Sequence, residues 1–200
     1  MEKIVLQKQS MRGKDGVFTL AQLRDTGMSA MNVSRAVKRG ELVRVAHGVY
    51  QMTEHAQFLD DEMYGTQLRY NRIVYSHDTA LYLHGLNDRD PLRYSVTVPI
   101  GYNTKKLTTE GFKVFSLNRE LYEEDVVETA TMHGNMVRLY GLERTICDCL
   151  RSRNKLQTEI VTAGLKGYVR RNDRNLNLLM NTAEKFKVAA ILKTYLEVLL

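Results

Sequence analysis

Cysteine is scarce in this chain of 200 residues, which contains only Cys147 and Cys149. The two lie two positions apart in a stretch with helical spacing, so their side chains point about 200° apart around the helix axis. Two thiols in that arrangement can neither form a disulfide with each other nor clamp one metal ion. The scarcity argues against a disulfide scaffold, and we expect both residues to be reduced structural thiols.

Long apolar runs and proline are also scarce. No apolar segment approaches the length that spans a membrane, and charges interrupt residues 1–16, so nothing there resembles a signal peptide. The only prolines are Pro91 and Pro99, so none interrupts the helices expected in the C-terminal part. We therefore expect a cytoplasmic protein with no membrane partner. The length and the 44% hydrophobic content suit one domain of ordinary size plus a small appended one.

The chain does contain a pattern typical of two short helices between residues 19 and 40. Thr19 and Ser29 are good N-caps, and Gly27 and Gly40 are typical of helix ends. The second helix is expected to run to about Arg39, with one side facing a core and a polar side facing outward. The expected core positions of this second helix are Ala30, Val33 and Val37.

Two short β-branched segments follow, at Leu42–Ala46 and Val49–Met52. They are joined by His47 and Gly48, a two-residue loop whose glycine can supply the positive φ that a tight hairpin needs. Two helices followed by such a hairpin are typical of a winged helix-turn-helix domain, in which the hairpin is the wing. We predict this domain over residues 1–53.

The charge distribution favours double-stranded DNA as the partner of this domain. Residues 1–50 contain nine Lys or Arg and four Asp or Glu, so they carry +5 of the net charge of +6. In the major groove, Arg can pair with guanine and Asn with adenine, while Lys and hydroxyl groups hold phosphates. The alternative is a merely solvated basic face, because small winged domains also bind proteins. The predicted DNA contacts are Arg24, Ser29, Asn32, Ser34, Arg35, Lys38, Arg39, Arg44 and His47.

Residues 54–200 predict a mixed α/β domain. A helical segment at His55–Arg72 opens it, and a capped helix is expected at Ser76–His84. The expected strands are Tyr94–Val98, Lys113–Leu117, Val126–Met132 and Met136–Tyr140, with a turn at His133–Asn135 between the last two. The expected C-terminal helices are Leu142–Arg153, Leu156–Arg170, Asn175–Lys185 and Lys187–Leu200. The fold class is therefore α+β, with an N-terminal winged helix-turn-helix domain and a C-terminal mixed α/β domain ending in several helices.

Ser76, His77 and Asp78, with His84 seven residues later, have the residue types of a hydrolase site. Neighbours at the start of a helix splay apart, however, whereas a catalytic triad needs members that converge from separate segments. Ser76 is better explained as an N-cap, Asp78 as an acid in the first turn and His84 as a residue at the helix C-terminus. His77 has no such explanation. A metal site at the two histidines lacks partners at ligand spacing, although Asp78 and Asp88 leave that alternative open.

Glu143, Arg144 and Asp148 allow two interpretations, an acid/base site or a salt-bridged helix. Arg144 and Asp148 are four residues apart and share a helix face, where an ion pair ordinarily contributes a few tenths of a kcal/mol. We favour the salt bridge. No glycine loop with the spacing of a phosphate-binding motif is present, so we expect no cofactor.

Several segments resemble the AbiEi family of antitoxins, in the order in which that family has them. Residues 39–45 (RGELVRV) and 48–50 (GVY) resemble its N-terminal winged helix. Residues 76–86 (SHDTALYLHGL), 95–99 (SVTVP) and 142–151 (LERTICDCLR) resemble blocks of its C-terminal domain. The resemblance extends over about residues 15–155.

The resemblance implies an antitoxin and transcriptional autorepressor, not an enzyme. The winged helix would bind inverted repeats in the promoter of a toxin–antitoxin operon. The domain at 54–200 would counter a nucleotidyltransferase-like toxin, AbiEii, in phage defence, and a stable complex with the toxin is not required. No cofactor or metal is implied. The alternatives are a winged-helix regulator with no toxin partner and, third, an enzyme. The candidates for the antitoxin function are Ser76, His77, His84, Glu143, Arg144 and Asp148.

Overall fold

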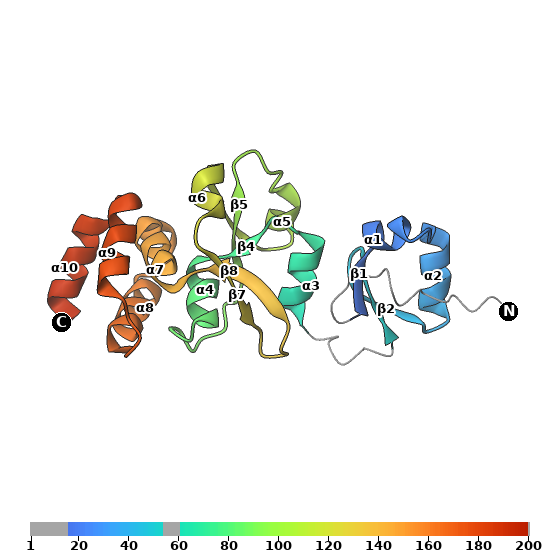
Figure 1. The fold of residues 1–200 in the computed structure, drawn as a ribbon, viewed down its shortest axis with the longest axis horizontal. Helices are drawn as coiled ribbons and strands as arrows, with labels where there is room; N and C mark the ends of the chain where they lie inside the picture. Colours follow the sequence, from blue (N-terminus) through green and yellow to red (C-terminus); the bar gives the residue numbers. More distant parts are fainter. Residues whose placement is uncertain (1–15, 54–60, 200) are drawn as a thin grey trace. The chain divides into compact units, whose positions relative to one another are not determined.

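The computed structural model describes residues 16–53 and 61–199, and the chain divides into two compact units (Figure 1). The first unit comprises Met1–Asn71 together with Ala130–Asn135, and the second comprises Arg72–Thr129 and Met136–Leu200. Each of the two units contains both helices and strands, which confirms that the structure is mixed α/β. The assignment of functional domains to 1–53 and 54–200 stays a prediction, because compactness alone does not test which residues perform which task.

The first unit contains a three-stranded antiparallel sheet in the order β1–β3–β2. Its elements are β1 (Val17–Thr19), α1 (Leu20–Asp25), α2 (Ala30–Lys38), β2 (Leu42–Ala46), β3 (Val49–Met52) and α3 (Glu62–Arg69). The two helices and the hairpin lie where the sequence predicts them, and Gly48 in the hairpin loop has a φ of +75°. Sequence analysis missed β1, which pairs with β3, because three residues are too few to show a period-two pattern.

The helix starts of the first unit follow from local capping. Thr19 and Gln22 form a capping box at α1, and the Ser29 hydroxyl accepts a hydrogen bond from the Asn32 backbone N–H at 3.2 Å. The buried residues of α2 are Val33 and Ala36. The prediction that Ala30 is a core residue is wrong. It is exposed because it lies on the side of Val33 away from Ala36, about 60° around the axis.

Helix α3 begins at a buried aspartate that links two parts of the first unit. One Asp61 oxygen caps α3 by accepting the Tyr64 backbone N–H at 3.0 Å. The other accepts hydrogen bonds from the Thr131 hydroxyl and, at 2.9 Å, from the Asn135 amide. The predicted helix at His55–Arg72 is too long at its C-terminal end, because α3 ends at Arg69. Its residues 55–60 lie outside the described ones.

The second unit contains a mixed five-stranded sheet in the order β6–β5–β4–β8–β7. The strands are β4 (Val74–Tyr75), β5 (Ser95–Pro99), β6 (Lys113–Leu117), β7 (Val126–Ala130) and β8 (Met136–Tyr140), and the short helices are α4 (His77–Leu83), α5 (Lys105–Thr109) and α6 (Arg119–Glu123). Strand β4 is antiparallel to β5 and parallel to β8, and β5 is parallel to β6. Sequence analysis missed β4, α5 and α6, which have two to five residues and show no usable periodicity.

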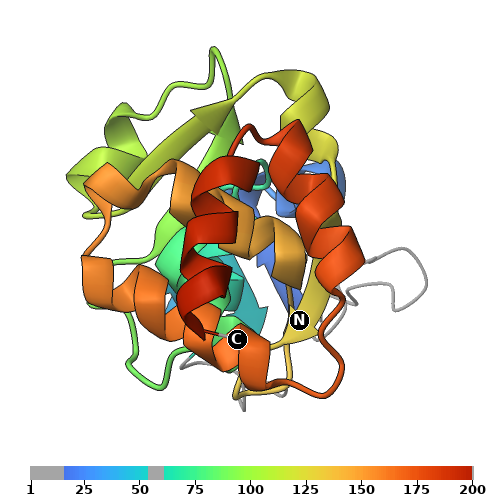
Figure 2. The same ribbon diagram turned by 90° about the vertical axis from the view of Figure 1, so that its left-hand side faces the viewer.

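Four helices complete the second unit: α7 (Leu142–Arg151), α8 (Thr158–Arg170), α9 (Leu176–Lys185) and α10 (Ala189–Leu199). A 3-10 turn at Arg153–Lys155 separates α7 from α8. The four predicted helices are confirmed, with ends shifted by no more than two residues. Figure 2 shows α8, α9 and α10 gathered around α7, and each of the three contacts α7.

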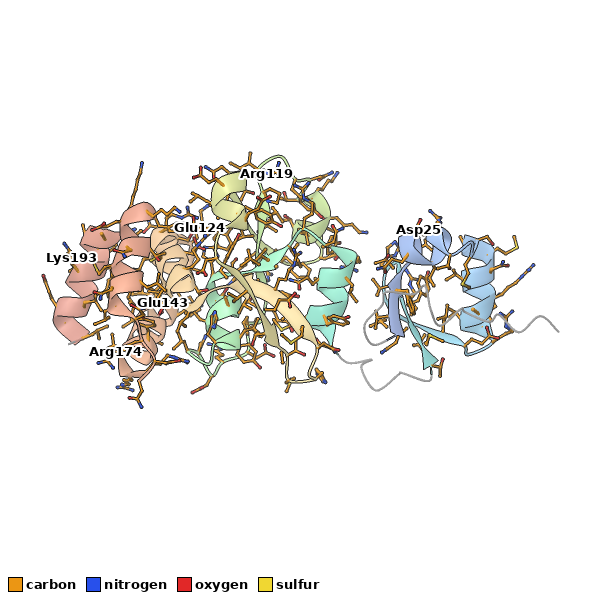
Figure 3. All side chains as sticks on the ribbon, viewed as in Figure 1. Asp25, Arg119, Glu124, Glu143, Arg174 and Lys193 are labelled. Carbon is orange, nitrogen blue, oxygen red and sulfur yellow. The ribbon has the colours of Figure 1, made fainter. Side chains whose placement is uncertain are left out.

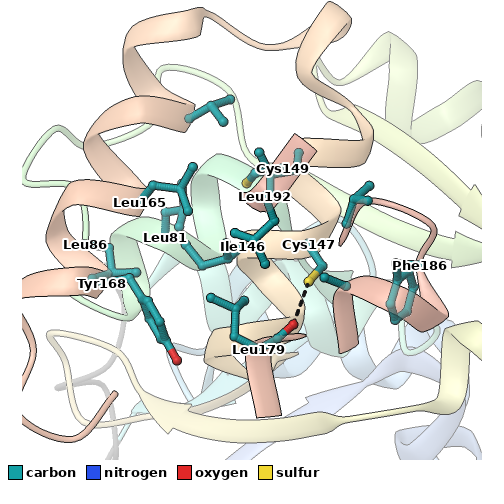
Figure 4. Close-up of a cluster of buried hydrophobic side chains, with 14 of the residues drawn as sticks. Leu81, Leu86, Ile146, Cys147, Cys149, Leu165, Tyr168, Leu179, Phe186 and Leu192 are labelled. Carbon is teal, nitrogen blue, oxygen red and sulfur yellow. Dashed lines mark hydrogen bonds between the residues drawn. The ribbon is translucent and has the colours of Figure 1, made fainter. Parts of the chain in front are cut away.

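The core of the second unit lies between α4 and these four helices (Figure 4). Leu81, Ile146, Leu165, Leu179 and Leu192, one from each helix, are almost completely buried. Helix α8 approaches α4 closely at its glycine in position 164, where a Cβ would lie 2.9 Å from the Leu81 Cδ1. Close packing at this point therefore depends on the missing side chain.

Both cysteines are buried in this core and unpaired, as expected from their spacing. The Cys147 thiol lies 3.9 Å from the Leu179 carbonyl oxygen, to which it donates a weak hydrogen bond (Figure 4). Burial raises the pKa of Cys147 to about 12 and that of Cys149 well above its ordinary value. Both thiols are therefore inert packing residues at neutral pH.

Candidate nucleic-acid interface

The outward side of α2 carries four of the residues predicted to contact DNA. Asn32, Ser34, Arg35 and Lys38 are all exposed. At 100° per residue, Arg35 and Lys38 lie on the side opposite the buried Val33, and Asn32 lies about 60° to one side of Arg35. Within the described residues, neither Arg35 nor Lys38 forms an ion pair, so both charges are available to a partner.

Sequence analysis missed one large residue on the same side of α2. Met31 is 63% exposed and lies between Lys38 and Arg35 when the helix is viewed along its axis. A methionine was easily overlooked in a search for charged and amide side chains. Its position follows from the same helical spacing that gives the polar side its direction.

Other predicted contacts in the first unit are already engaged within the chain. Arg39 donates two hydrogen bonds to the Glu41 carboxylate, at 2.8 and 2.9 Å. The Arg44 guanidinium lies 2.7 Å from the His47 Nδ1 within the hairpin. The Ser29 hydroxyl is used as the α2 cap, and Arg24 is exposed in the last turn of α1. Arg39, Arg44, His47 and Ser29 would therefore exchange existing contacts for new ones on binding a partner.

In the second unit, Ser76 occupies the N-cap position of α4 but does not cap it, so this expectation is wrong. Its hydroxyl accepts a hydrogen bond from the Thr97 hydroxyl at 2.9 Å and lies 2.9 Å from the His77 Nδ1. These side-chain partners, Thr97 on β5 and His77 on α4 itself, replace the backbone N–H that a local N-cap would bind. Ser76 thus joins α4 to β5.

His77, which the sequence left without an explanation, is an almost fully buried member of the same hydrogen-bonded chain. Its Nε2 lies 3.0 Å from the Ser152 hydroxyl, and its ring stacks on Phe115 with centroids 3.5 Å apart. Its φ of +51° is unusual for a residue with a Cβ. Burial, with the nearby Arg151, lowers the pKa of His77 well below its ordinary value, so the ring is neutral at pH 7.

His84 lies at the C-cap of α4, as predicted. Its Nε2 donates a hydrogen bond to the Tyr140 carbonyl at 2.8 Å, and the Thr145 hydroxyl donates to the same carbonyl at 3.1 Å. Burial lowers the pKa of His84, and its bond to Tyr140 partly opposes that shift. The two histidines therefore attach opposite ends of α4 to the rest of the unit.

The predicted Arg144–Asp148 salt bridge is confirmed, with 2.8 Å between Nε and Oδ2. Both side chains are completely buried, and the guanidinium carbon lies 4.1 Å from the ring centroids of Tyr140 and Phe186. Burial raises the pKa of Asp148, while Arg144 and Arg151 oppose the shift. The few tenths of a kcal/mol expected for an i,i+4 pair apply to an exposed one. In a buried pair, removing one partner costs about 3–5 kcal/mol, because the other charge stays buried without its partner.

Glu143 points away from that pair and binds a different helix. One Glu143 oxygen accepts a hydrogen bond from the Tyr168 hydroxyl at 2.9 Å, and that hydroxyl accepts the Asn175 backbone N–H at 2.9 Å. Charged side chains elsewhere, among them Arg119 and Lys193, project from the surface (Figure 3). The six antitoxin candidates therefore form structural contacts rather than one site: Ser76 contacts His77, Arg144 pairs with Asp148, and His84 and Glu143 bind elsewhere. Ser76, His77, Arg144 and Asp148 are buried and so inaccessible to a partner.

A surface cavity of about 330 Å³ lies elsewhere in the second unit and contains none of the six candidates. One wall carries an ion pair of 2.7 Å between the Lys113 Nζ and the Asp78 Oδ2. The other lining residues are Asn87, Arg89, Asp90, Pro91, Leu92, Arg93, Gln157 and Ile160. Within 16–53 and 61–199, no group of three or more His, Cys, Asp or Glu is placed to hold a metal ion, and no helix is long and apolar enough to cross a membrane.

A comparison with known families identifies the segment that forms the helices and hairpin. Residues 10–53 match the family of transcriptional regulators described as AbiEi antitoxins. The predicted family resemblance is thereby confirmed for this segment, which includes β1, α1, α2, β2 and β3 of the first unit.

Two further comparisons add little to the AbiEi match. Among curated proteins, no sequence matches the chain. Among solved structures, the crystal structure of the RV2827C protein from Mycobacterium tuberculosis is similar, with a TM-score of 0.48 and 11% sequence identity. That similarity covers 90% of this chain and 75% of the other.

Proposed function

We propose that this protein is an antitoxin and transcriptional autorepressor of a toxin–antitoxin operon, acting in the cytoplasm. The observation that carries the proposal is the AbiEi match over residues 10–53, which coincides with two helices, a hairpin and an exposed basic helix side. A winged helix-turn-helix places its second helix in the major groove. Helix α2 is the second helix of this arrangement.

On this proposal, α2 reads the inverted repeats of the operon promoter. Arg35 pairs with a guanine and Asn32 with an adenine, while Ser34 and Lys38 hold phosphates. Arg24, Ser29, Arg39, Arg44 and His47 contribute backbone contacts around that helix. Since Arg39 is paired with Glu41, its contribution is smaller than that of the unpaired Arg35.

The domain at 54–200 counters a nucleotidyltransferase-like toxin and performs no catalysis. Four of its six candidate residues are buried. These four therefore act only indirectly, by maintaining the fold of the domain that contacts the toxin or its target. Glu143 and His84 are partly exposed, and both are also engaged in hydrogen bonds within the chain. If the domain contacts the toxin directly, the contact surface therefore consists mainly of exposed residues that sequence analysis did not single out.

Binding of the full-length protein to DNA tests the regulatory part. A fluorescent duplex from the promoter of its own operon is titrated and compared with a scrambled duplex of equal length and composition. We expect the promoter to bind at least about 10³-fold more tightly at physiological salt, the lower end for specific regulators. Equal affinity for both duplexes would contradict sequence-specific repression.

Rescue in cells tests the antitoxin part. Cells carrying the inducible downstream toxin should survive when the full-length protein is co-expressed, and die without it. Arg35→Ala should derepress a promoter reporter and still protect the cells. If that variant, at equal soluble level, failed to protect, neutralisation would depend on DNA binding.

A plain transcriptional regulator with no toxin partner is the second candidate. It is favoured by the length of the family match, which ends at residue 53 and leaves the second unit unmatched. An operon without a nucleotidyltransferase-like reading frame beside this gene would favour this candidate, and survival of toxin-expressing cells only with the protein would reject it.

A further inference from the structure

Met31 is a large apolar side chain on the exposed, otherwise polar side of α2. It is the only exposed large hydrophobic residue within 16–53, and 63% of its surface is accessible. Val33 and Ala36 already supply the contact of α2 with the core of the first unit. Met31 therefore has no packing function within the described fold.

Its position on α2 is that of a residue aimed at a partner. Met31 is the second residue of the helix, and Arg35 and Lys38 follow it at the i+4 and i+7 positions of the same side. The three lie within about 60° around the axis, opposite Val33. Recognition helices contact base edges mainly through their N-terminal residues, so the centre of the contacting surface includes Met31.

We propose that Met31 reads a thymine by packing against its 5-methyl group in the major groove. The inference rests on the proposed DNA-binding function. The thymine methyl is the one apolar group that the major-groove edges of the four bases present, and apolar side chains are what recognises it. The unbranched methionine side chain can adjust to reach it beside the bidentate contact of Arg35.

The experiment pairs a protein variant with a DNA variant that removes the same contact. The full-length protein first selects its preferred sites from a randomised duplex library. Each thymine of the selected site is then replaced by uracil, which lacks only the 5-methyl group. Affinities for the thymine and uracil duplexes are measured for the unchanged protein and for Met31→Ala, which keeps a strong helix former at an exposed position.

We expect one thymine-to-uracil replacement to weaken binding of the unchanged protein about fourfold, as expected for one buried methyl group. For Met31→Ala, the same replacement should have no effect. Met31→Leu should keep part of the thymine preference, since it keeps an apolar end. Leu178→Ala is the matched control, because Leu178 is an exposed apolar residue on α9 of the second unit, and it should leave the preference unchanged.

The outcomes separate this inference from the proposed function. If no site is selected and the protein binds all duplexes alike, sequence-specific binding itself is wrong. If a site is selected but no uracil replacement distinguishes the unchanged protein from Met31→Ala, the thymine contact is wrong and DNA binding stands. Circular dichroism of Met31→Ala that matches the unchanged protein excludes misfolding as the cause of any loss.

Discussion

Arginine has opposite environments in the two units. On α2, Arg35 is exposed and forms no ion pair within the described residues. On α7, Arg144 is completely buried between two aromatic rings and bonded to Asp148. Arg35 can exchange its bound water for a binding partner at a small cost in free energy. Arg144, in contrast, is needed to balance the charge of a buried carboxylate. Residue type alone therefore does not separate binding residues from structural ones, and burial does.

Two ion pairs of identical spacing make the comparison sharper within the second unit. Arg119 and Glu123 on α6 form an i,i+4 pair of 3.0 Å with both side chains exposed. Arg144 and Asp148 form one of 2.8 Å with both buried. Exposed pairs contribute about 0.3–0.5 kcal/mol, because water solvates each charge nearly as well when the pair is broken.

The largest expected effect is that of breaking the buried pair. Arg144→Ala should lower the free energy of unfolding by about 3–5 kcal/mol, since Asp148 is left charged and buried with only Arg151 nearby. Urea denaturation monitored by circular dichroism measures it. Arg119→Ala is the control and should cost no more than about 0.5 kcal/mol. Equal losses in the two variants would show that burial does not distinguish these pairs.

The next effect concerns recognition by the exposed arginine. Arg35→Ala should cost about 1–3 kcal/mol of binding free energy and relax the preference at one base pair, because the bidentate guanine contact is lost. Fluorescence anisotropy with a set of single-base operator variants measures both. The free energy of unfolding should change by less than about 0.5 kcal/mol.

Arg170→Ala is the matched control for that measurement, because Arg170 is an exposed arginine on α8 of the second unit. It should bind the same operators like the unchanged protein. A larger loss for Arg170→Ala than for Arg35→Ala would move the DNA-binding surface to the second unit.

The buried histidine should make stability depend on pH. Because burial lowers the pKa of folded His77, the unfolded chain takes up this proton first as the pH falls below about 6.5. Stability is therefore complete above that pH and decreases below it, with a slope approaching about 1.4 kcal/mol per pH unit. His77→Asn, which tolerates the positive φ, should lose this part of the slope.

Unfolding free energies between pH 7.5 and 5.5 test the histidine prediction. The difference in slope between the unchanged protein and His77→Asn isolates His77, since His84 contributes in the same direction in both proteins. Parallel pH profiles would show that His77 does not stay neutral in the folded state.

The smallest effect is that of one exposed lysine. Lys38→Ala should weaken binding to every duplex alike and reduce the slope of log Kd against log salt concentration by about one unit, as expected for one phosphate contact. Anisotropy titrations at several salt concentrations measure it. A loss confined to one operator variant would make Lys38 a base contact.

Where local chemistry decides the structure, the sequence predicted it well. Thr19 and Ser29 cap α1 and α2, Gly48 allows the hairpin, and the apolar spacing of the last four helices predicts their bounds within two residues. Each of these patterns depends on residues a few positions apart. The same reasoning failed for the very short elements, in which too few residues repeat.

Where distant residues decide, the sequence was not sufficient. Ser76 does not cap its helix because Thr97, 21 residues away, binds its hydroxyl. Arg144 is buried because Phe186, from beyond α9, covers one side of its guanidinium. A pattern of neighbouring residues cannot reveal contacts between residues that lie this far apart in the sequence. The exposed DNA candidates on α2 were easier to find, because an outward side of a helix follows directly from its period.

The hydrogen bonds of Asp61 to Thr131 and Asn135 limit how segments of related genes can be recombined. Because the first unit takes Ala130–Asn135 from the middle of the chain, its polypeptide is discontinuous. A single recombination event near residue 71 would separate Asp61 from Thr131 and Asn135, and would join a new N-terminal segment to a turn that was shaped for the old one. Exchange of operator specificity between relatives is therefore easier by substitutions on α2 than by swapping an N-terminal segment that extends to residue 71.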